Sequence, residues 1–194
     1  MIKKIKLSII LLIIATAQSN ALIEVDITRG NLDPLPIAVS PLSADKDTNE
    51  KLTKELKIDK VGHEISSVVE NNLRNSGLFN PLNKDAFLQK PNIAHLKPRF
   101  EDWSLIKAQA LITGKVTFAE DKLRVEFRLW DVLAAKEIMA LAFTTVPKNW
   151  RRVGHIISDK VYERLTGEKG YFDTRIIYVS EKGPKTQKIG RAHV

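Results

Sequence analysis

The sequence predicts an α/β fold of the α+β type, in which a mixed β-sheet is packed by two long α-helices. Residues 123–130 alternate strictly between apolar and charged or polar side chains up to Leu129, which is the period of a half-buried strand. Two segments show apolar stripes at helical spacing, residues 59–76 and residues 149–166. The stripe of the second segment consists of Trp150, Val153, Ile157, Val161 and Leu165. A helix with one apolar stripe and a sheet with one apolar face bury each other, which gives this fold class.

Composition places the chain among ordinary folded proteins. Its 194 residues are 43% hydrophobic and 28% charged, which suits one or at most two domains with a real core. The chain has no cysteine, and this excludes disulfides, thiolate metal sites and cysteine nucleophiles.

The first 21 residues are typical of a secretory signal peptide. Lys3, Lys4 and Lys6 precede a largely apolar run, and Ser19 and Ala21 are small residues at the positions that a signal peptidase requires. The apolar run is shorter than the roughly 20 residues of a membrane span. Loss of these three lysines lowers the formal charge from +8 to +5, and an exported protein meets no chromosomal DNA. We therefore expect export and no nucleic-acid partner.

The segment that follows the predicted cleavage site alternates like a strand. It consists of Leu22, Ile23, Glu24, Val25, Asp26, Ile27 and Thr28. Two interpretations are open: the segment forms an edge of the domain's own sheet, or it docks by adding a strand to the sheet of a partner.

The patterns in the middle of the chain, residues 36–106, predict a short strand, two helices and two loops. Residues 36–39 form a short strand, residues 43–57 a polar surface loop with at most a helical turn, and residues 59–76 a helix that Gly77 ends. Residues 80–99 are expected to be a loop with a short ordered piece near residues 86–88. A short helix over residues 100–106 directs Phe100, Trp103 and Ile106 to one side.

The last third predicts a three-stranded meander and a closing helix. The strands are residues 110–118, 123–130 and 137–146, with one wet and one buried face. The helix that begins near Asn149 stops at Gly167 and Gly170, and residues 175–180 start a new strand. Residues 22–170 thus form one compact domain.

No arrangement of side chains indicates catalysis, a cofactor or a metal. The four histidines stand singly, at His63, His95, His155 and His193, and none has a partner at metal-ligand spacing. We expect His63 to form an exposed helical pair with Glu64, and His155 to pack or hydrogen-bond beside the buried face of its helix. The alternative, an exported small-molecule-binding domain or enzyme of unknown substrate, requires His63 and His155 together in an open cleft.

Several short stretches resemble, in the same order, the amino-terminal half of the TolB family, the periplasmic components of the Tol-Pal system. These stretches are residues 73–82, 100–103, 108–114, 154–155, 158–159, 165–167 and 174–179. The resemblance implies a small α/β domain before a six-bladed β-propeller that binds the lipoprotein Pal. It also implies that Leu22–Thr28 contacts the inner-membrane protein TolA, which favours the partner-binding interpretation of this segment. The implied role is to maintain the outer membrane and its constriction at cell division, without stable membrane insertion after signal cleavage.

The sequence departs from the family pattern near its end. The family continues into propeller blades, whereas this chain reads Glu181–Lys188 and then six residues, 189–194, that resemble a translated sequencing adapter. We therefore expect residues 171–194 to hold a linker, the start of a first propeller strand and an artefactual tail, with the propeller missing. The strand at residues 175–180 is expected to lack a partner and to expose its edges.

Overall fold

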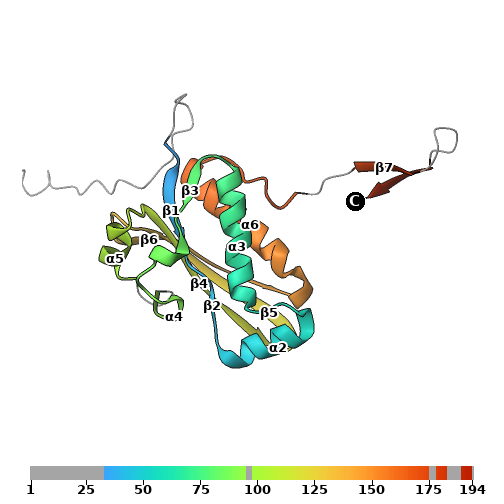
Figure 1. The fold of residues 1–194 in the computed structure, drawn as a ribbon, viewed down its shortest axis with the longest axis horizontal. Coiled ribbons are helices and arrows are strands. Elements are labelled where there is room, and N and C mark those ends of the chain that lie inside the picture. Colours follow the sequence, from blue (N-terminus) through green and yellow to red (C-terminus); the bar gives the residue numbers. More distant parts are fainter. Residues whose placement is uncertain (1–32, 95–97, 175–177, 183–188, 194) are drawn as a thin grey trace, which may run out of the picture.

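The structure is a computed structural model that describes residues 33–94, 98–174, 178–182 and 189–193 (Figure 1). Its elements in chain order are β1 (Leu35–Val39), β2 (Ser43–Ala44), α2 (Lys46–Leu56), α3 (Val61–Asn75), β3 (Phe79–Pro81), η1 (Lys84–Ala86), α4 (Pro91–Ala94), α5 (Phe100–Leu105), β4 (Ala110–Ala119), β5 (Lys122–Asp131), β6 (Lys136–Thr145), η2 (Pro147–Asn149), α6 (Trp150–Thr166), β7 (Tyr178–Lys182) and β8 (Ile189–His193). No helix among these residues is long and apolar enough to cross a membrane.

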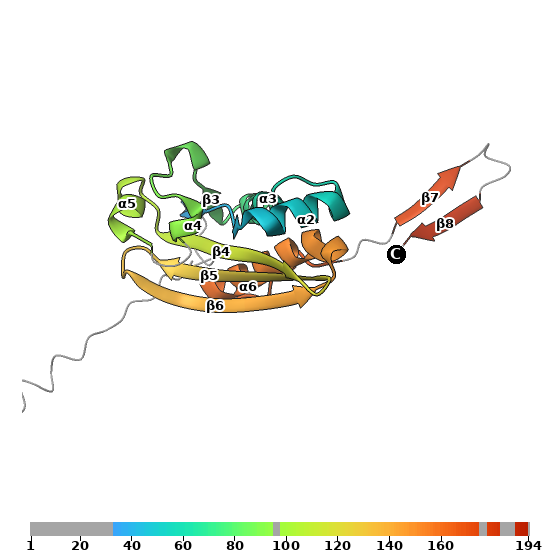
Figure 2. The same cartoon turned by 90° about the horizontal axis from the view of Figure 1, so that it is seen from below.

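One mixed sheet of six strands organises the domain. Its order is β3-β1-β4-β5-β6, and the short strand β2 pairs with β4. Strands β1, β2 and β3 make parallel pairs, while β4, β5 and β6 form an antiparallel meander (Figure 2). The predicted mixed sheet and its meander are confirmed, and β6 forms one edge of the sheet.

The two long helices, α3 and α6, cover one face of this sheet and form the main core with it. The predicted stripe of α6 lies in this core, with Trp150 partly buried and the other four side chains buried. Each fully buried aliphatic side chain of this kind contributes about 1.5–3 kcal/mol. The helices approach closely at Gly154, where an added Cβ would lie 2.8 Å from Val68 Cγ1. A larger residue at Gly154 therefore requires α3 and α6 to separate.

The prediction of a loop over residues 43–57 is wrong, because this segment forms β2 and the helix α2. The Asp45 carboxylate caps α2 by accepting the Thr48 N–H at 2.7 Å. Only Thr48 and Leu52 of the helix are buried, so its apolar stripe is too narrow to be seen in a strongly charged segment. The helix α3 likewise begins at Val61 rather than near Asp59.

The predicted loop over residues 80–99 contains more regular structure than expected. Phe79 lies in the core and opens β3, which pairs in parallel with β1. The short helices η1 and α4 follow β3. The helix α5 comes next and confirms the short helix predicted over residues 100–106. Sequence reasoning missed β3 because it is three residues long and contains Pro81.

The face of the sheet opposite the long helices is wet along most of the meander, but not at the end of β5. There Trp130 is buried beneath α5, and its ring centroid lies 5.9 Å from that of Phe100. Trp103 joins this second apolar cluster as the buried residue of α5. The prediction of one entirely wet face is therefore wrong at this end, because α5 covers it.

The last described elements are the strands β7 and β8. They pair antiparallel as a two-stranded sheet, with Tyr178 opposite His193 and Lys182 opposite Ile189. The expectation that the strand near residues 175–180 lacks a partner is therefore wrong for one of its edges. Its partner, β8, lies in the residues that we expect to be an artefactual tail.

Candidate functional site

The predicted TolA-contacting segment, Leu22–Thr28, lies outside the described residues. The described chain begins at Asp33, two residues before β1. Its contact with a partner accordingly stays a prediction.

His155 connects the two long helices through a polar contact. Its Nδ1 lies 2.9 Å from the Nδ2 of Asn72 on α3, and the same Nδ2 donates to the Ser158 hydroxyl at 2.9 Å. Because an amide nitrogen only donates, Nδ1 accepts and the imidazole is assigned the Nε2–H tautomer. Burial, followed by the positive charge of Arg151, lowers the pKa of His155 below its usual value. The prediction of a hydrogen-bonding role for His155 is confirmed.

His63 lies far from His155 and is exposed. It occupies the first turn of α3, with its Nδ1 3.8 Å from the Glu64 carboxylate, as the sequence predicts. Asn72, the partner of His155, is nine residues further along the same helix, a distance of about 13 Å. The two histidines therefore share no cleft, and within the described ranges no group of three or more metal-ligating side chains occurs.

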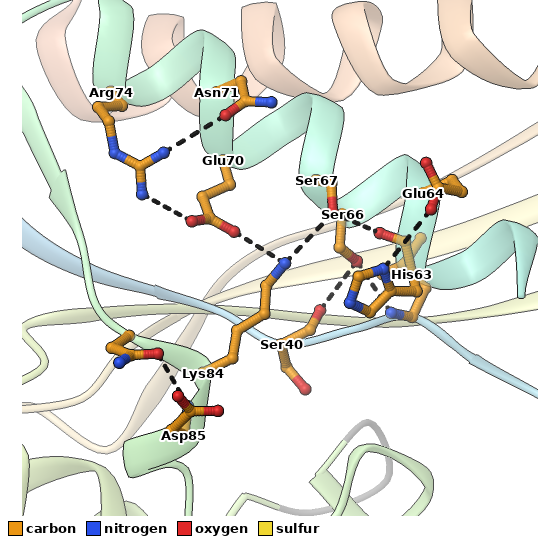
Figure 3. A network of polar contacts seen from close by, with 12 residues as sticks. Ser40, His63, Glu64, Ser66, Ser67, Glu70, Asn71, Arg74, Lys84 and Asp85 are labelled. Atoms are coloured by element: carbon orange, nitrogen blue, oxygen red, sulfur yellow. Dashed lines mark hydrogen bonds and ion pairs between the residues drawn. The ribbon is translucent and has the colours of Figure 1, made fainter.

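A row of polar contacts along α3 fastens this helix to the neighbouring loops (Figure 3). The buried Ser66 hydroxyl accepts the Leu42 N–H at 2.9 Å and donates to the Ser40 carbonyl at 3.1 Å. One turn after Ser66 on α3 comes Glu70, whose carboxylate contacts Arg74 at 2.6 Å and Lys84 at 2.8 Å. Burial raises the pKa of Glu70, but the hydrogen bonds from Lys84 and Arg74 outweigh it and lower the pKa overall. These groups are mutually paired, which indicates a structural role.

The chain after α6 folds back onto this helix instead of leaving it. The Asp159 carboxylate accepts the backbone N–H groups of Phe172 at 2.6 Å and Asp173 at 3.1 Å. Arg152, two turns earlier on α6, donates from Nε and Nη2 to the Asp173 carboxylate at 3.1–3.2 Å. Gly170 packs so tightly that an added Cβ would lie 2.4 Å from the Asp159 Cα. We call residues 170–173 the strap.

Aromatic side chains hold the strap from its other side. The ring centroid of Tyr162 lies 5.6 Å from that of Tyr171 and 5.8 Å from that of Phe172. Tyr162 also contacts Phe79 of β3 edge to face, so the strap is joined to the main core. The turn predicted at Gly167 is present with φ +76°, but sequence reasoning missed the docking of the strap. The residue that could have indicated this docking is Asp159. A partly buried carboxylate near the end of a helix needs hydrogen-bond donors from another part of the chain.

A groove opens between β6 and α6 on the side away from α3. Its volume is about 280 Å³, and its walls include Phe143 and Thr145 of β6, Asn149 at the end of η2, and Arg152 and Ile156 of α6. The groove lies beside the edge of the sheet and holds no converging acid, base or nucleophile.

The fold and these surfaces define a class of protein: a mixed α/β domain whose described polar side chains pair mainly with one another, with β6 at one edge of its sheet. A family model described as the TolB amino-terminal domain matches residues 23–138. The chain is 76% identical over 180 residues to the Tol-Pal system protein TolB of Pelagibacter ubique (strain HTCC1062), which covers 93% of this chain and 40% of that protein. The chain belongs to the TolB family.

A solved structure supports the same fold. The crystal structure of TolB from Acinetobacter baumannii matches with a TM-score of 0.60 and 23% identity, over 81% of this chain and 35% of that one. At this identity the likeness shows the fold. The chain spans less than half of the length of either relative.

Proposed function

We propose that the chain is a periplasmic protein-interaction component of a Tol-Pal system, and that Leu22–Thr28 is its contact with TolA. The observation that carries this proposal is the 76% identity to a Tol-Pal system protein across 93% of the chain. The role at the outer membrane and at cell division follows from that membership. The proposal assigns no catalytic activity, and it needs no cofactor.

The alternating pattern of Leu22–Thr28 supports a strand that adds to the sheet of its partner. Main-chain hydrogen bonds supply much of the affinity in this mode of recognition, and alternate side chains supply the specificity. The resemblance to the TolB family implies that Pal binds to the β-propeller of the family. The proposed contact with Pal therefore applies only to the longer proteins of the family.

The competing proposal of an exported enzyme or small-molecule-binding domain is not favoured by any observation. It depended on His63 and His155 meeting in one cleft, and His155 instead bonds Asn72 between the two helices. The walls of the groove beside β6 combine apolar side chains with two threonines, an asparagine and one cation, Arg152, which already pairs with Asp173.

Deletion of residues 22–29 tests the TolA contact. We expect the affinity for the periplasmic part of TolA, measured by calorimetry, to fall by on the order of 100-fold or more, because the added strand is lost. A matched control exchanges Ile23→Val, Val25→Ile and Ile27→Val, which keeps the alternation and should retain the affinity within about threefold. The unfolding transition of the deleted protein should match that of the full chain. Undiminished affinity after the deletion would refute the assignment.

A further inference from the structure

The strand β6 forms one edge of the sheet and lacks most of the features that usually protect an edge (Figure 2). Among the described residues no strand pairs with its outer side. Natural edges are blunted by charged residues, by proline or by a short length. β6 has ten residues, and its two charged residues, Lys136 and Glu137, stand at its first two positions. The uncharged run over residues 138–145, which contains no proline, is suited to pair with another strand.

The inner face of this edge carries apolar side chains that the domain covers only in part. Leu141 pairs opposite the buried Phe127 and therefore faces the long helices, yet it is 38% exposed. Its neighbours on the same face, Met139 and Phe143, are partly buried against the main core. A strand that buries all three side chains must itself present apolar residues at the same spacing.

The strand β6 is itself such a strand. When two copies run antiparallel with Leu141 opposite its own counterpart, Met139 of each copy lies opposite Phe143 of the other. On the outer face, Ala140 of each copy lies opposite Ala142 of the other. Every pair within residues 139–143 is therefore apolar, and no charged side chain lies in this stretch.

We propose that two copies of the chain associate through β6, as an antiparallel pair centred on Leu141 that joins the two sheets into one. The two-fold axis is perpendicular to the sheet, because opposed residues of neighbouring strands point to the same face. Both copies contribute the same strand, as in other isologous interfaces. This inference goes beyond the proposed function, because it requires neither TolA nor residues 22–28.

The position of α6 leaves room for this association. The helix contacts the sheet mainly at β5, one strand inward from the edge. The two β5 strands of the pair are three strand spacings apart, about 14 Å, and the two α6 helices above them are separated by a similar distance. Helices in direct contact lie about 8–10 Å apart, so a layer of side chains fits between them. Phe143 and Ile156, which line the groove in each copy, supply that layer together with Leu141.

The charged side chains beside the edge do not oppose the association. Arg128 and Glu126 of β5 each have an ion-pair partner within their own chain. The pairing places Arg128 of one copy in the same row as Glu126 of the other, about 14 Å apart across two alanines. The two rows therefore hold opposite charges, which attract only weakly at this distance. Burial of the apolar inner face supplies the affinity.

Other registers match the two strands less well. A shift by one residue sets the apolar face of one copy against the outer face of the other. A pair centred on residue 140 places Phe143 opposite Glu137, and a pair centred on residue 142 places Met139 opposite Thr145. The register centred on Leu141 pairs Met139, Leu141 and Phe143 only with one another.

Sedimentation velocity of the full chain tests the association. One strand from each copy makes an interface smaller than the about 1,200 Å² of stable complexes, so we expect a dissociation constant on the order of 10–100 µM. A chain that remains monomeric at concentrations about tenfold above this range would refute the proposal. The measurement contains no TolA, so failure of the association and failure of the proposed function are distinguishable.

A charge at the two-fold axis should prevent the pairing. Leu141→Lys brings two like charges together, and we expect it to weaken dimerisation by at least about tenfold. The matched control, Leu133→Lys, changes a leucine that is 70% exposed and lies before β6, and it should dimerise like the unchanged chain. Unchanged dimerisation of Leu141→Lys, or equal weakening in both variants, would contradict the proposed interface.

Cysteine variants test the register while they retain Leu141, because the chain contains no cysteine. A mixture of Ala140→Cys chains with Ala142→Cys chains places two thiols on directly opposed residues, whose Cβ atoms lie about 5 Å apart. The control mixture combines Ala142→Cys chains with Val146→Cys chains. Val146 is 44% exposed, but in the proposed register it lies about 20 Å along the strand from the Ala142→Cys thiol.

Mild oxidation followed by mass spectrometry compares the two mixtures. We expect the mixed disulfide of the test mixture to form at least about tenfold faster than that of the control mixture, because only the opposed pair is within bridging distance. Equal rates in the two mixtures would overturn the register. Disulfide-linked dimers of a single variant that form as fast as the mixed dimer would overturn it as well.

Discussion

The two flanks of α6 differ in how completely they are packed. On the flank toward α3, Gly154 contacts Val68 and Asn72 bonds both His155 and Ser158, so little space is left between the helices. On the flank toward β6, a groove of about 280 Å³ separates Ile156 from Phe143. The same helix is therefore tightly packed on one side and incompletely covered on the other.

Truncation of neighbouring isoleucines gives the largest expected difference between the flanks. Ile157→Ala removes a core side chain that is 1% exposed, and we expect a loss of about 2–5 kcal/mol in the free energy of unfolding. Ile156→Ala, on the groove side, is the matched control and should cost about 1 kcal/mol or less. Urea unfolding of both variants measures the difference. Equal losses would contradict this difference in packing.

The strap gives an intermediate effect, because it covers the part of α6 next to the groove. Asp159→Asn keeps the shape but turns an amide N–H₂ toward the backbone donors of Phe172 and Asp173. We expect exchange of these two amides to accelerate by about tenfold, which corresponds to a loss of about 1.4 kcal/mol. Asp173→Asn, which removes only the exposed ion pair with Arg152, should have a much smaller effect. Unchanged exchange in Asp159→Asn would show that aromatic packing alone holds the strap.

The smallest expected effect is a pH dependence of the free energy of unfolding, which arises from His155 on the flank of α6 toward α3. The pKa of His155 is lowered in the folded chain by burial and by Arg151, against the opposing charges of Asp173 and Asp159. The unfolded chain therefore binds more protons as the pH falls below about 6.5. The contribution of neutral His155 to the free energy of unfolding is therefore present above that pH, and it is lost as the pH falls toward the lowered pKa.

Two histidine variants isolate this contribution. His155→Gln can still accept from Asn72 but does not titrate, so its unfolding midpoint should fall less between pH 7 and pH 5.5 than that of the unchanged chain. His63→Gln, at the exposed histidine, should retain the fall. Parallel curves for His155→Gln and the unchanged chain would show that His155 is not the group responsible.

Local patterns were sufficient to predict the elements whose faces differ strongly in polarity. The stripe of α6, the apolar side of α5 and the alternation in β5 all follow from neighbours within one or two turns or along one strand. The helix α2 was not predicted, because Leu52 is the one buried leucine of a segment that is otherwise mostly polar. The burial of Trp130 was not predicted, because α5, which covers it, comes from a distant part of the sequence.

Long-range polar partners account for what was missed around the candidate sites. Gln89 is buried, and its side-chain oxygen accepts the Arg99 N–H and the Trp103 indole N–H, which no spacing rule reveals. Asp159 finds its donors 13 and 14 residues away. The open edge of β6 depends on the strand order, which becomes known only when all strands are placed. The TolA contact rests on family resemblance and on a segment outside the described residues.

The tight seat of Gly170 has a mechanical consequence. Because the strap touches the backbone of α6 at Gly170 and is tied to it at Asp159 and Arg152, Thr174 is attached to the helix rather than to a free linker. A tilt of α6 therefore moves Thr174 in the same direction and by a similar amount.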